Sequence, residues 1–163
     1  MEEVTYMDNK YWNQRIRDTI EKCAYEFYVV HPIKEVKCPC VDLSTKQADP
    51  GCKMCLGMGC KIKIRKIRGA ANDIESNAAG KGVRGSAALT VAKTYFIDSK
   101  YPIGDTDMII DDDEVLYVFR VYTMKGMEGI VTHNQVTAFP MRNDHKLTLK
   151  NFREMMKRYG GKR

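Results

Sequence analysis

The amino-acid sequence predicts an α+β protein with an N-terminal helix, a cysteine-rich module, a small antiparallel β-barrel or sandwich, and a short C-terminal helix. Two observations predict this class. Five of the six cysteines fall within residues 38–60, a clustering typical of a stapled loop. Apolar residues then recur at every second position through much of residues 87–139, which indicates strands, whereas helical spacing precedes and follows these segments.

Length and composition restrict the class of protein. A chain of 163 residues suits one hydrophobic core, because two domains of half that length would be marginally stable. Hydrophobic residues make up 44% and charged residues 29% of the chain, which argues against disorder or a fibre. The chain has no apolar run long enough to cross a bilayer, and residues 1–12 lack the pattern of a secretion signal. We therefore expect neither a secreted nor a membrane protein, and no repeat array.

Residues 1–35 are expected to form an N-terminal helix that packs on the body of the protein. Asp8 is a suitable N-cap, and Pro32 would end the helix. The stripe predicted to face the body has helical spacing and consists of Trp12, Ile16, Ile20, Cys23, Ala24 and Phe27. Cys23 is thus expected in the core.

Residues 36–68 are interpreted as a metal-binding module followed by the first strand. Cys38-Pro-Cys40 and Cys52-Lys-Met-Cys55 are two close pairs of thiols. Without a secretion signal the compartment is expected to be reducing, where such pairs hold a metal more often than they form disulfides. Two turns can bring Cys38, Cys40, Cys52 and Cys55 together around one tetrahedral zinc ion. Four sulfur ligands leave no open position for a substrate, so the expected Zn²⁺ is structural.

Cys60 is the alternative ligand, because the one-residue spacing of Cys38 and Cys40 leaves the ligand set open. It could replace one of the first pair. We expect it to be a buried free thiol instead, since it begins an alternating strand in which Ile62 and Ile64 point inward. A redox-active dithiol is disfavoured, because nothing here resembles the helix-capped site that activates a thiolate.

Residues 69–86 are predicted to be a flexible loop, and residues 87–145 an antiparallel β domain. The segment 72–84 is rich in Gly and Ala and has one large apolar residue. The predicted strands of the β domain are 87–97, 108–110, 115–123 and 129–139, with 111–114 as an acidic hairpin turn.

Residues 146–163 are predicted to be a basic C-terminal helix and tail. Asn151 and Glu154 have the spacing of a capping box, and Gly160-Gly161 would end the helix. The apolar face would consist of Phe152, Met155, Met156 and Tyr159.

Charge is segregated along the chain. The formal net charge is +6, and the tail from Lys146 to Arg163 holds seven basic residues and one acidic residue, which accounts for all of it. A basic run includes Lys61, Lys63 and Arg65, and an acidic run includes Asp111, Asp112 and Asp113. Such runs usually mark solvated surface. The sharper hypothesis is that the two runs dock on neighbouring subunits, or that the basic run binds nucleic acid.

The sequence gives no indication of an enzyme. His31, His133 and His145 are scattered, and no serine or cysteine beside them suggests a nucleophile. The acidic run lacks the pattern of a calcium loop. Gly80-Lys-Gly-Val-Arg-Gly85 lacks the Gly-Lys-Ser/Thr ending of a phosphate-binding loop. We therefore expect a protein that is not an enzyme.

Two families resemble parts of this chain. The segment Cys52-Lys-Met-Cys-Leu-Gly-Met-Gly59 resembles the zinc-binding repeat of J-domain co-chaperones, and this resemblance is confined to one zinc knuckle. The layout over roughly residues 30 to 140 resembles the neck proteins of tailed bacteriophages, in the head-tail connector or stopper group. The cysteine-module segments that carry this second resemblance are His31-Pro-Ile, Cys38-Pro-Cys40 and Asp49-Pro-Gly-Cys-Lys-Met-Cys-Leu-Gly-Met-Gly59.

In the β domain the resemblance to the neck proteins rests on Pro102-Ile-Gly-Asp105, Ile109-Ile-Asp111, Val115-Leu-Tyr-Val-Phe-Arg-Val121 and His133-Asn-Gln-Val136. It implies a structural virion protein, made in the host cytoplasm, that forms a homo-oligomeric ring. Such a ring joins the portal side of the head to the tail and helps to close the DNA channel. The implied partners are other copies of the chain, portal or adaptor and tail proteins, and packaged DNA in the channel. The alternative function is a zinc-stabilised nucleic-acid-binding module.

Overall fold

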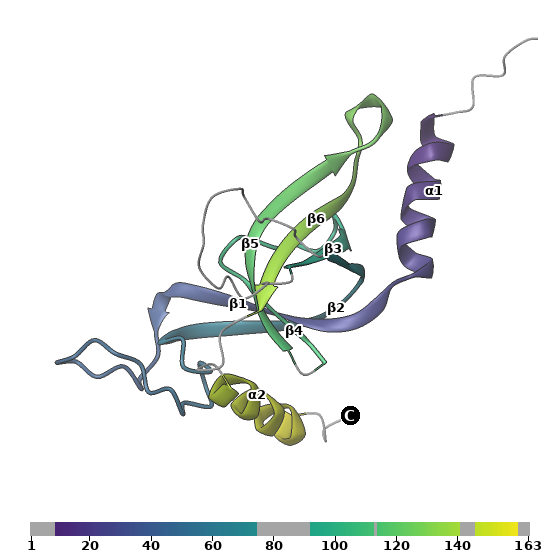
Figure 1. Cartoon of the computed structure of the whole chain (residues 1–163). Coiled ribbons are helices and arrows are strands. Elements are labelled where there is room, and N and C mark those ends of the chain that lie inside the picture. Colours follow the sequence, from purple (N-terminus) through teal and green to yellow (C-terminus); the bar gives the residue numbers. More distant parts are fainter. Residues whose placement is uncertain (1–8, 75–91, 113, 141–145, 160–163) are drawn as a thin grey trace, which may run out of the picture.

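Six antiparallel strands form the body of the protein, and a helix lies at each end of the chain (Figure 1). The computed structural model describes residues 9–74, 92–112, 114–140 and 146–159. The elements in chain order are α1 (Asn9–Lys22), β1 (Tyr25–Lys37), β2 (Cys60–Ile74), β3 (Ala92–Asp98), β4 (Met108–Asp111), β5 (Glu114–Lys125), a 3-10 turn (Met127–Gly129), β6 (Val131–Pro140) and α2 (Lys146–Tyr159). No helix in these ranges is long and apolar enough to span a membrane.

The sheet closes on itself. The strands pair in the order β1-β2-β3-β6-β5-β4, and β4 pairs back with β1 to close a barrel. Asp111 pairs with Glu114, so two residues make the β4–β5 turn at the predicted position. The prediction of an α+β chain with an N-terminal helix, antiparallel strands and a short C-terminal helix is confirmed.

The barrel interior is one apolar cluster in which Tyr95 is the largest side chain. The Tyr95 ring packs against Phe27 with 4.9 Å between the ring centroids. Its hydroxyl donates to the buried Asp111 carboxylate over 2.7 Å, and the Tyr25 hydroxyl donates to the same oxygen over 2.6 Å. Burial, and then the Asp111 carboxylate, raise the pKa of Tyr95 well above its usual range, so this hydroxyl keeps its proton. The other members of the cluster are Val29, Ile67, Ile97, Ile109, Leu116, Val118, Val136 and Ala138.

A second apolar cluster lies on the outer face of the barrel, under α2. Phe152 of α2 is buried there against Tyr28, with 5.2 Å between the ring centroids. The strand residues of this cluster include Val30, Met108, Ile110 and Val115, and Met155 and Met156 pack on it from α2. β1 thus buries side chains on both faces, Phe27 and Val29 inside and Val30 outside.

The prediction that one helix continues from Asp8 to Pro32 is wrong. Helix α1 ends at Lys22 and β1 begins at Tyr25. In the run from Phe27 to Val30, three residues are buried on the two faces of a strand and Tyr28 is half-buried, and such a run also satisfies helical spacing. The expected cap, Asp8, lies outside the described residues.

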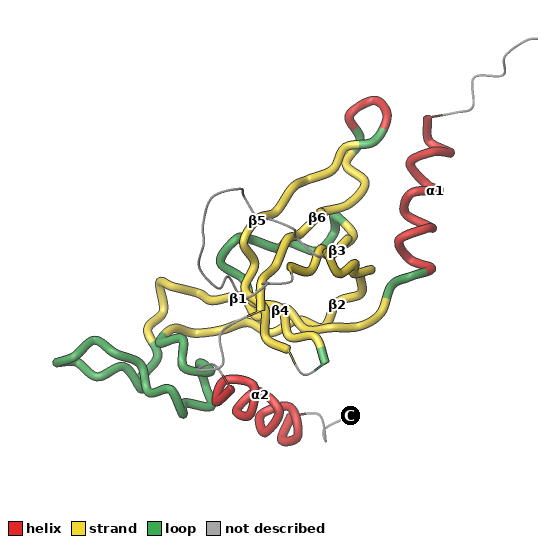
Figure 2. The backbone as a smooth tube through the Cα atoms, in the orientation of Figure 1, coloured by secondary structure: helices red, strands yellow, loops and turns green. Residues whose placement is uncertain are grey.

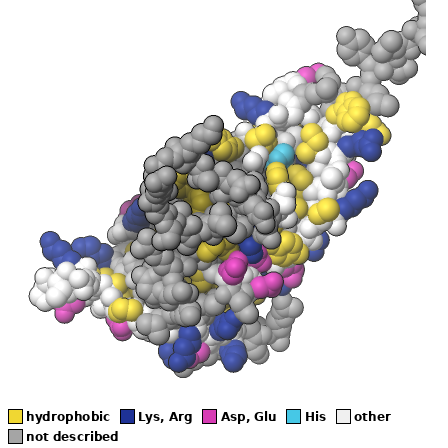
Figure 3. All heavy atoms as spheres, in the orientation of Figure 1, with side chains coloured by type: hydrophobic (Ala, Val, Ile, Leu, Met, Phe, Trp, Pro, Cys, Tyr) yellow, Lys and Arg dark blue, Asp and Glu magenta, His cyan; other side chains and the backbone are white. Residues whose placement is uncertain are grey.

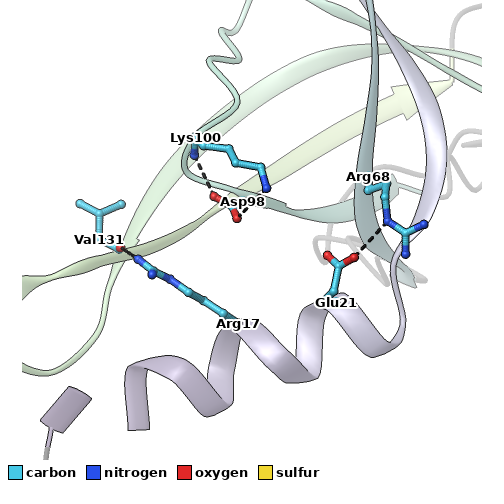
Figure 4. Close-up of polar contacts among 6 residues, drawn as sticks. All are labelled: Arg17, Glu21, Arg68, Asp98, Lys100 and Val131. Carbon is cyan, nitrogen blue, oxygen red and sulfur yellow. Dashed lines mark hydrogen bonds and ion pairs between the residues drawn. The ribbon is translucent and has the colours of Figure 1, made fainter. Parts of the chain in front are cut away.

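Helix α1 packs on the barrel with its polar face. The Arg17 guanidinium donates to the Val131 carbonyl over 3.0 Å, and Glu21 pairs with Arg68 over 3.0 Å (Figure 4). Asp98 and Lys100 lie on the barrel side of this contact between α1 and the barrel. Part of the expected apolar stripe therefore faces solvent: Trp12 is 41% exposed, and Cys23 is exposed rather than part of the core, whereas Ile20 is half-buried.

Two further boundaries differ from prediction. β2 runs on to Ile74, so residues 69–74 are strand and not loop. The rest of the predicted loop, within residues 75–91, lies outside the described residues. Helix α2 begins at Lys146, which places Asn151 inside the helix and not at its cap. The Asn151 side chain instead donates to the Pro50 carbonyl over 3.3 Å, a tertiary contact that capping-box spacing cannot reveal.

We predict that Gly126→Ala detaches α1. A Cβ atom at position 126 would collide with the buried Asn13 side chain and would lie 2.9 Å from the Thr132 methyl group. The free energy of unfolding should fall by about 1–3 kcal/mol, the usual cost of overpacking. Thermal denaturation measures this loss, and trypsin should cut sooner at Lys22. Gly104→Ala is the matched control, because no atom lies within 4 Å of its added Cβ. Equal stability of the two variants would contradict the prediction.

Candidate metal centre

The four predicted ligands lie in the loop that joins β1 to β2. We call residues 38–59 the cysteine loop. The outer part of the β1–β2 hairpin, residues 31–37 and 60–63, carries this loop, and we call it the arm. The arm extends away from the barrel, with the cysteine loop at its end (Figure 2). Strands β1 and β2 pair from Tyr25 with Gly69 out to Lys37 with Cys60, which holds the two ends of the loop together. The ligand pairs therefore start from a fixed base.

The structure brings together the sulfur atoms of Cys38, Cys40, Cys52 and Cys55. All four lie within 4.8 Å of one another. The Sγ atoms of Cys38 and Cys52 are 3.8 Å apart, and those of Cys40 and Cys55 are 3.5 Å apart. A tetrahedral ion with metal–sulfur bonds of about 2.3 Å separates its ligands by about 3.8 Å. The arrangement is therefore compatible with a four-sulfur metal site, as the sequence predicted.

Backbone amides surround the sulfur cluster. The Gly59 amide donates to Cys55 Sγ over 3.3 Å, and the amides of Met54 and Cys55 donate to Cys52. Burial raises the pKa of the Cys55 thiol to about 12. Burial also acts to raise the pKa of Cys52, but the amides outweigh it and bring that pKa to about 7. Amide donors stabilise thiolates, and a bound cation would compensate the charge of the buried sulfurs.

Left-handed backbone makes the turn around Cys55 possible. Leu56, Gly57 and Gly59 have φ values of 53°, 81° and 72°. The Gly59 carbonyl accepts from the Cys38 amide over 2.9 Å, while its own amide reaches Cys55. Residue 59 thereby links the two cysteine pairs. A Cβ atom there would lie 3.1 Å from Ala48, so both the conformation and the space favour glycine.

The cysteine loop is anchored to the body by α2. Leu56 is buried in the second apolar cluster beside Phe152. Lys53 forms an ion pair with Glu154 over 2.7 Å, and Asn151 bonds to Pro50. The Lys53 side chain and the Pro50 carbonyl therefore both contact α2, and Leu56 joins the loop to the barrel.

Cys60 lies outside the four-sulfur group. It is buried at the first position of β2, and burial raises its pKa. This placement agrees with the expected buried thiol and does not favour the alternative in which Cys60 replaces a ligand.

The predicted interface residues lie in different environments. Lys61 and Lys63 are exposed on the arm, and Arg65 is half-buried. Asp112 is exposed, whereas Asp111 is buried and bonded to Tyr25 and Tyr95. Asp113 lies outside the described residues. The Asp111 side chain therefore belongs to the core. A role in docking stays a prediction for the other five residues.

Sequence reasoning missed a pair formed by His31 and Asp107. The two side chains are 2.5 Å apart, although 76 positions separate them in the chain. Asp107 is only 1% exposed, and its other carboxylate oxygen accepts from the Gly104 amide over 3.0 Å. A spacing pattern carries no signal for such a distant contact. The pair ties β1 to the loop before β4, next to the base of the arm.

Comparisons with known proteins give no family for this chain. No protein-family model matches the sequence, and no curated protein matches it significantly.

We predict that Cys52→Ser removes the metal and destabilises the arm. The metal content should fall from about one ion per chain to nearly none, because four sulfur ligands bind one ion. The free energy of unfolding should fall by about 3 kcal/mol or more, since the binding energy of a structural metal contributes to folding. Plasma emission spectrometry and thermal denaturation measure the two effects.

Two cysteine variants serve as controls for Cys52→Ser. Cys23→Ser changes an exposed thiol that follows α1 and lies outside the sulfur group, so it should change neither quantity. Cys60→Ser should keep the full metal content, because Cys60 is outside the sulfur group. Loss of metal from Cys60→Ser would show that the ligand set is different.

Proposed function

We propose that this chain is a structural protein of the neck of a tailed bacteriophage. In this proposal it forms a homo-oligomeric ring between the portal side of the head and the tail, and helps to close the DNA channel. Its partners are other copies of itself, portal or adaptor proteins and tail proteins. It works as part of the virion and not as an enzyme. The resemblance in layout described above is the first support for this function.

The single observation that carries the proposal is a strip of exposed aromatic side chains on the outer face of β5. Tyr117, Phe119 and Tyr122 are all exposed, Phe119 to 54%. Tyr117 stacks on Phe139 of β6 with 5.9 Å between the ring centroids. Arg120 lies between Phe119 and Tyr122, 5.5 Å from each ring. We call these five residues the aromatic strip.

The composition of the aromatic strip is that of a protein interface. Aromatic residues and arginine are enriched in the buried centres of interfaces and dominate their binding energy. Exposed hydrophobic side chains gather over the β5–β6 hairpin and α1 in the space-filling view (Figure 3). On α1, Tyr11, Trp12 and Ile16 are exposed as well. A monomer gains nothing from such surface, whereas a subunit of an assembly covers it.

We further propose that the metal is zinc and that its role is structural. Four cysteine ligands are typical of closed zinc sites, and such sites have no free coordination position. An ion in the cysteine loop would fix the arm relative to α2, through Lys53 and Asn151. A rigid arm suits a subunit that contacts its neighbours in a ring. Elemental analysis distinguishes zinc from iron.

The second candidate function, nucleic-acid binding, is favoured by two lysines of the arm. Lys61 and Lys63 are exposed and form no ion pair with another described residue, whereas Lys66 and Arg68 are paired with Glu26 and Glu21. The residues paired with this part of β2 are Ile33, Pro32 and His31, so no tyrosine, tryptophan or phenylalanine lies directly opposite for base stacking. Phosphate contacts alone give weak, nonspecific binding.

We predict that the purified chain forms rings with a central channel and that the aromatic strip is needed for them. Phe119→Ser with Tyr122→Ser should shift the protein to monomers, because interface aromatics carry much of the binding energy. Negative-stain electron microscopy and light scattering report the rings and the mass. The control is Val36→Ser, which changes an exposed apolar residue of the arm. Rings that persist in the double variant would exclude the strip, and a chain that never assembles would contradict the proposal.

We predict weak binding to duplex DNA, with a Kd of about 10 μM or higher at physiological salt, as for nonspecific phosphate contacts. The logarithm of the affinity should fall linearly with that of the salt concentration, by about 0.9 per phosphate neutralised. Fluorescence anisotropy measures both. Submicromolar binding that is lost on changing Lys61, Lys63 and Arg65 to Ala would favour the nucleic-acid module instead.

A further inference from the structure

A groove lies on the arm. It has a volume of about 1070 Å³ and runs between the outer part of β1 and the cysteine loop. Val41 and Met58 contribute apolar surface to it, and Lys34, Lys37 and Lys46 contribute ammonium groups. Asp42 is its one acidic lining residue. We call this cavity the lysine groove.

No described carboxylate pairs with the ammonium groups of the three groove lysines. All three are exposed, and none forms an ion pair within the described part of the chain. Some lysines elsewhere are paired, such as Lys53 with Glu154 and Lys66 with Glu26, whereas Lys61 and Lys63 on β2 are not paired with a described residue. Lys and Arg side chains are visible at the end of the arm in Figure 3.

Asp42 can offset only one of these three positive charges. One oxygen of its carboxylate already accepts the backbone amides of Ser44 and Thr45, over 2.7 and 2.9 Å, and the Ser44 hydroxyl. The Ser44 hydroxyl and these amides lower the pKa of Asp42 to about 2. This carboxylate shapes the turn at the end of the loop and leaves the groove with an excess of positive charge.

Leu43 indicates a protein ligand for the groove. It stands in that same turn, lines the groove and is 96% exposed, more than any other large hydrophobic side chain in the described residues. Apolar walls and a fully exposed leucine fit a protein segment with an apolar side chain. Nucleic acid fits less well, because no aromatic ring lines the groove for stacking.

The chain itself carries a segment with the complementary charge. At the β4–β5 turn, Asp112 is exposed and the neighbouring Glu114 is exposed beside its partner Lys93. Tyr25, which bonds to Asp111, adds a partly exposed ring at this end of the barrel. We call this region the acidic turn. In Figure 1 the end of the arm and the acidic turn lie well apart, so this turn is placed to meet the groove of another molecule.

We propose that the lysine groove of one copy of this chain binds the acidic turn of the next copy. The inference rests on the proposed function, because a ring requires contacts between two unlike surfaces of the same chain. Complementary charge sets the register of such a contact and speeds its formation. Each copy offers one groove and one acidic turn, so the contact can repeat around a closed ring. The metal would act in assembly by holding the walls of the groove in place.

Charge reversal tests the proposal on the full-length, metal-loaded chain. The groove variant carries Lys34→Glu, Lys37→Glu and Lys46→Glu, and the turn variant carries Asp112→Lys and Glu114→Lys. Sedimentation velocity at low ionic strength should show self-association at least about tenfold weaker for each variant, because like charges then face each other. The control carries Lys150→Glu and Lys157→Glu, which reverse two exposed lysines of α2 that do not line the groove.

A chain with both sets of reversals should assemble like the wild type, since the charges are again complementary. A misfolded variant cannot give this rescue. Absence of rescue, with both variants folded by thermal denaturation, would overturn the proposal. If the wild type forms rings and the groove variant forms them equally well, the proposed groove contact is overturned, while the neck function stands. A wild-type chain that stays monomeric would overturn both. Loss of DNA binding without loss of self-association would assign the groove to phosphate.

Discussion

The convergence of four sulfur atoms in the cysteine loop is the constraint on which the outer half of the molecule depends. The cysteine loop is long and mostly exposed. Besides three of its cysteines, its one buried residue is Leu56. Such a segment cannot repay the entropy of its own ordering through apolar burial. An ion bound by the two cysteine pairs would fix both halves of the loop at once. The contacts of α2 with Pro50 and Lys53 then have a rigid surface to meet.

The rest of the fold distributes apolar surface between two sides of one sheet. The inner cluster around Tyr95 closes the barrel, and the outer cluster around Phe152 receives α2 and Leu56. β1 serves both clusters because neighbouring residues of a strand point to opposite faces. The first helix is the exception. It docks through Asn13, Arg17 and Glu21 and leaves Tyr11, Trp12 and Ile16 exposed, which is costly for a monomer and useful for a subunit.

The proposed role in an assembly draws on several unlike surfaces of one small chain. The aromatic strip lies on β5, the lysine groove on the arm and the acidic turn at one end of the barrel. The groove lies on the arm, which extends away from the barrel that carries the other two surfaces (Figure 1). A heterologous contact needs this separation, because two complementary surfaces side by side would satisfy each other within one molecule.

The sequence by itself determined the class of fold, most strand positions, the hairpin turn at Asp111–Glu114 and the four cysteines of the metal centre. These features rest on local spacing: alternation in strands, and close thiol pairs flanked by glycines that permit left-handed backbone. Only the tertiary structure decided where α1 ends, which face of it docks, and that Asp111 is buried. Those outcomes depend on partners far along the chain, such as Tyr95 for Asp111 and Val131 for Arg17. A run such as Phe27 to Val30 satisfies both helical and strand spacing, and only the availability of apolar surface on both sides of the sheet selects the strand.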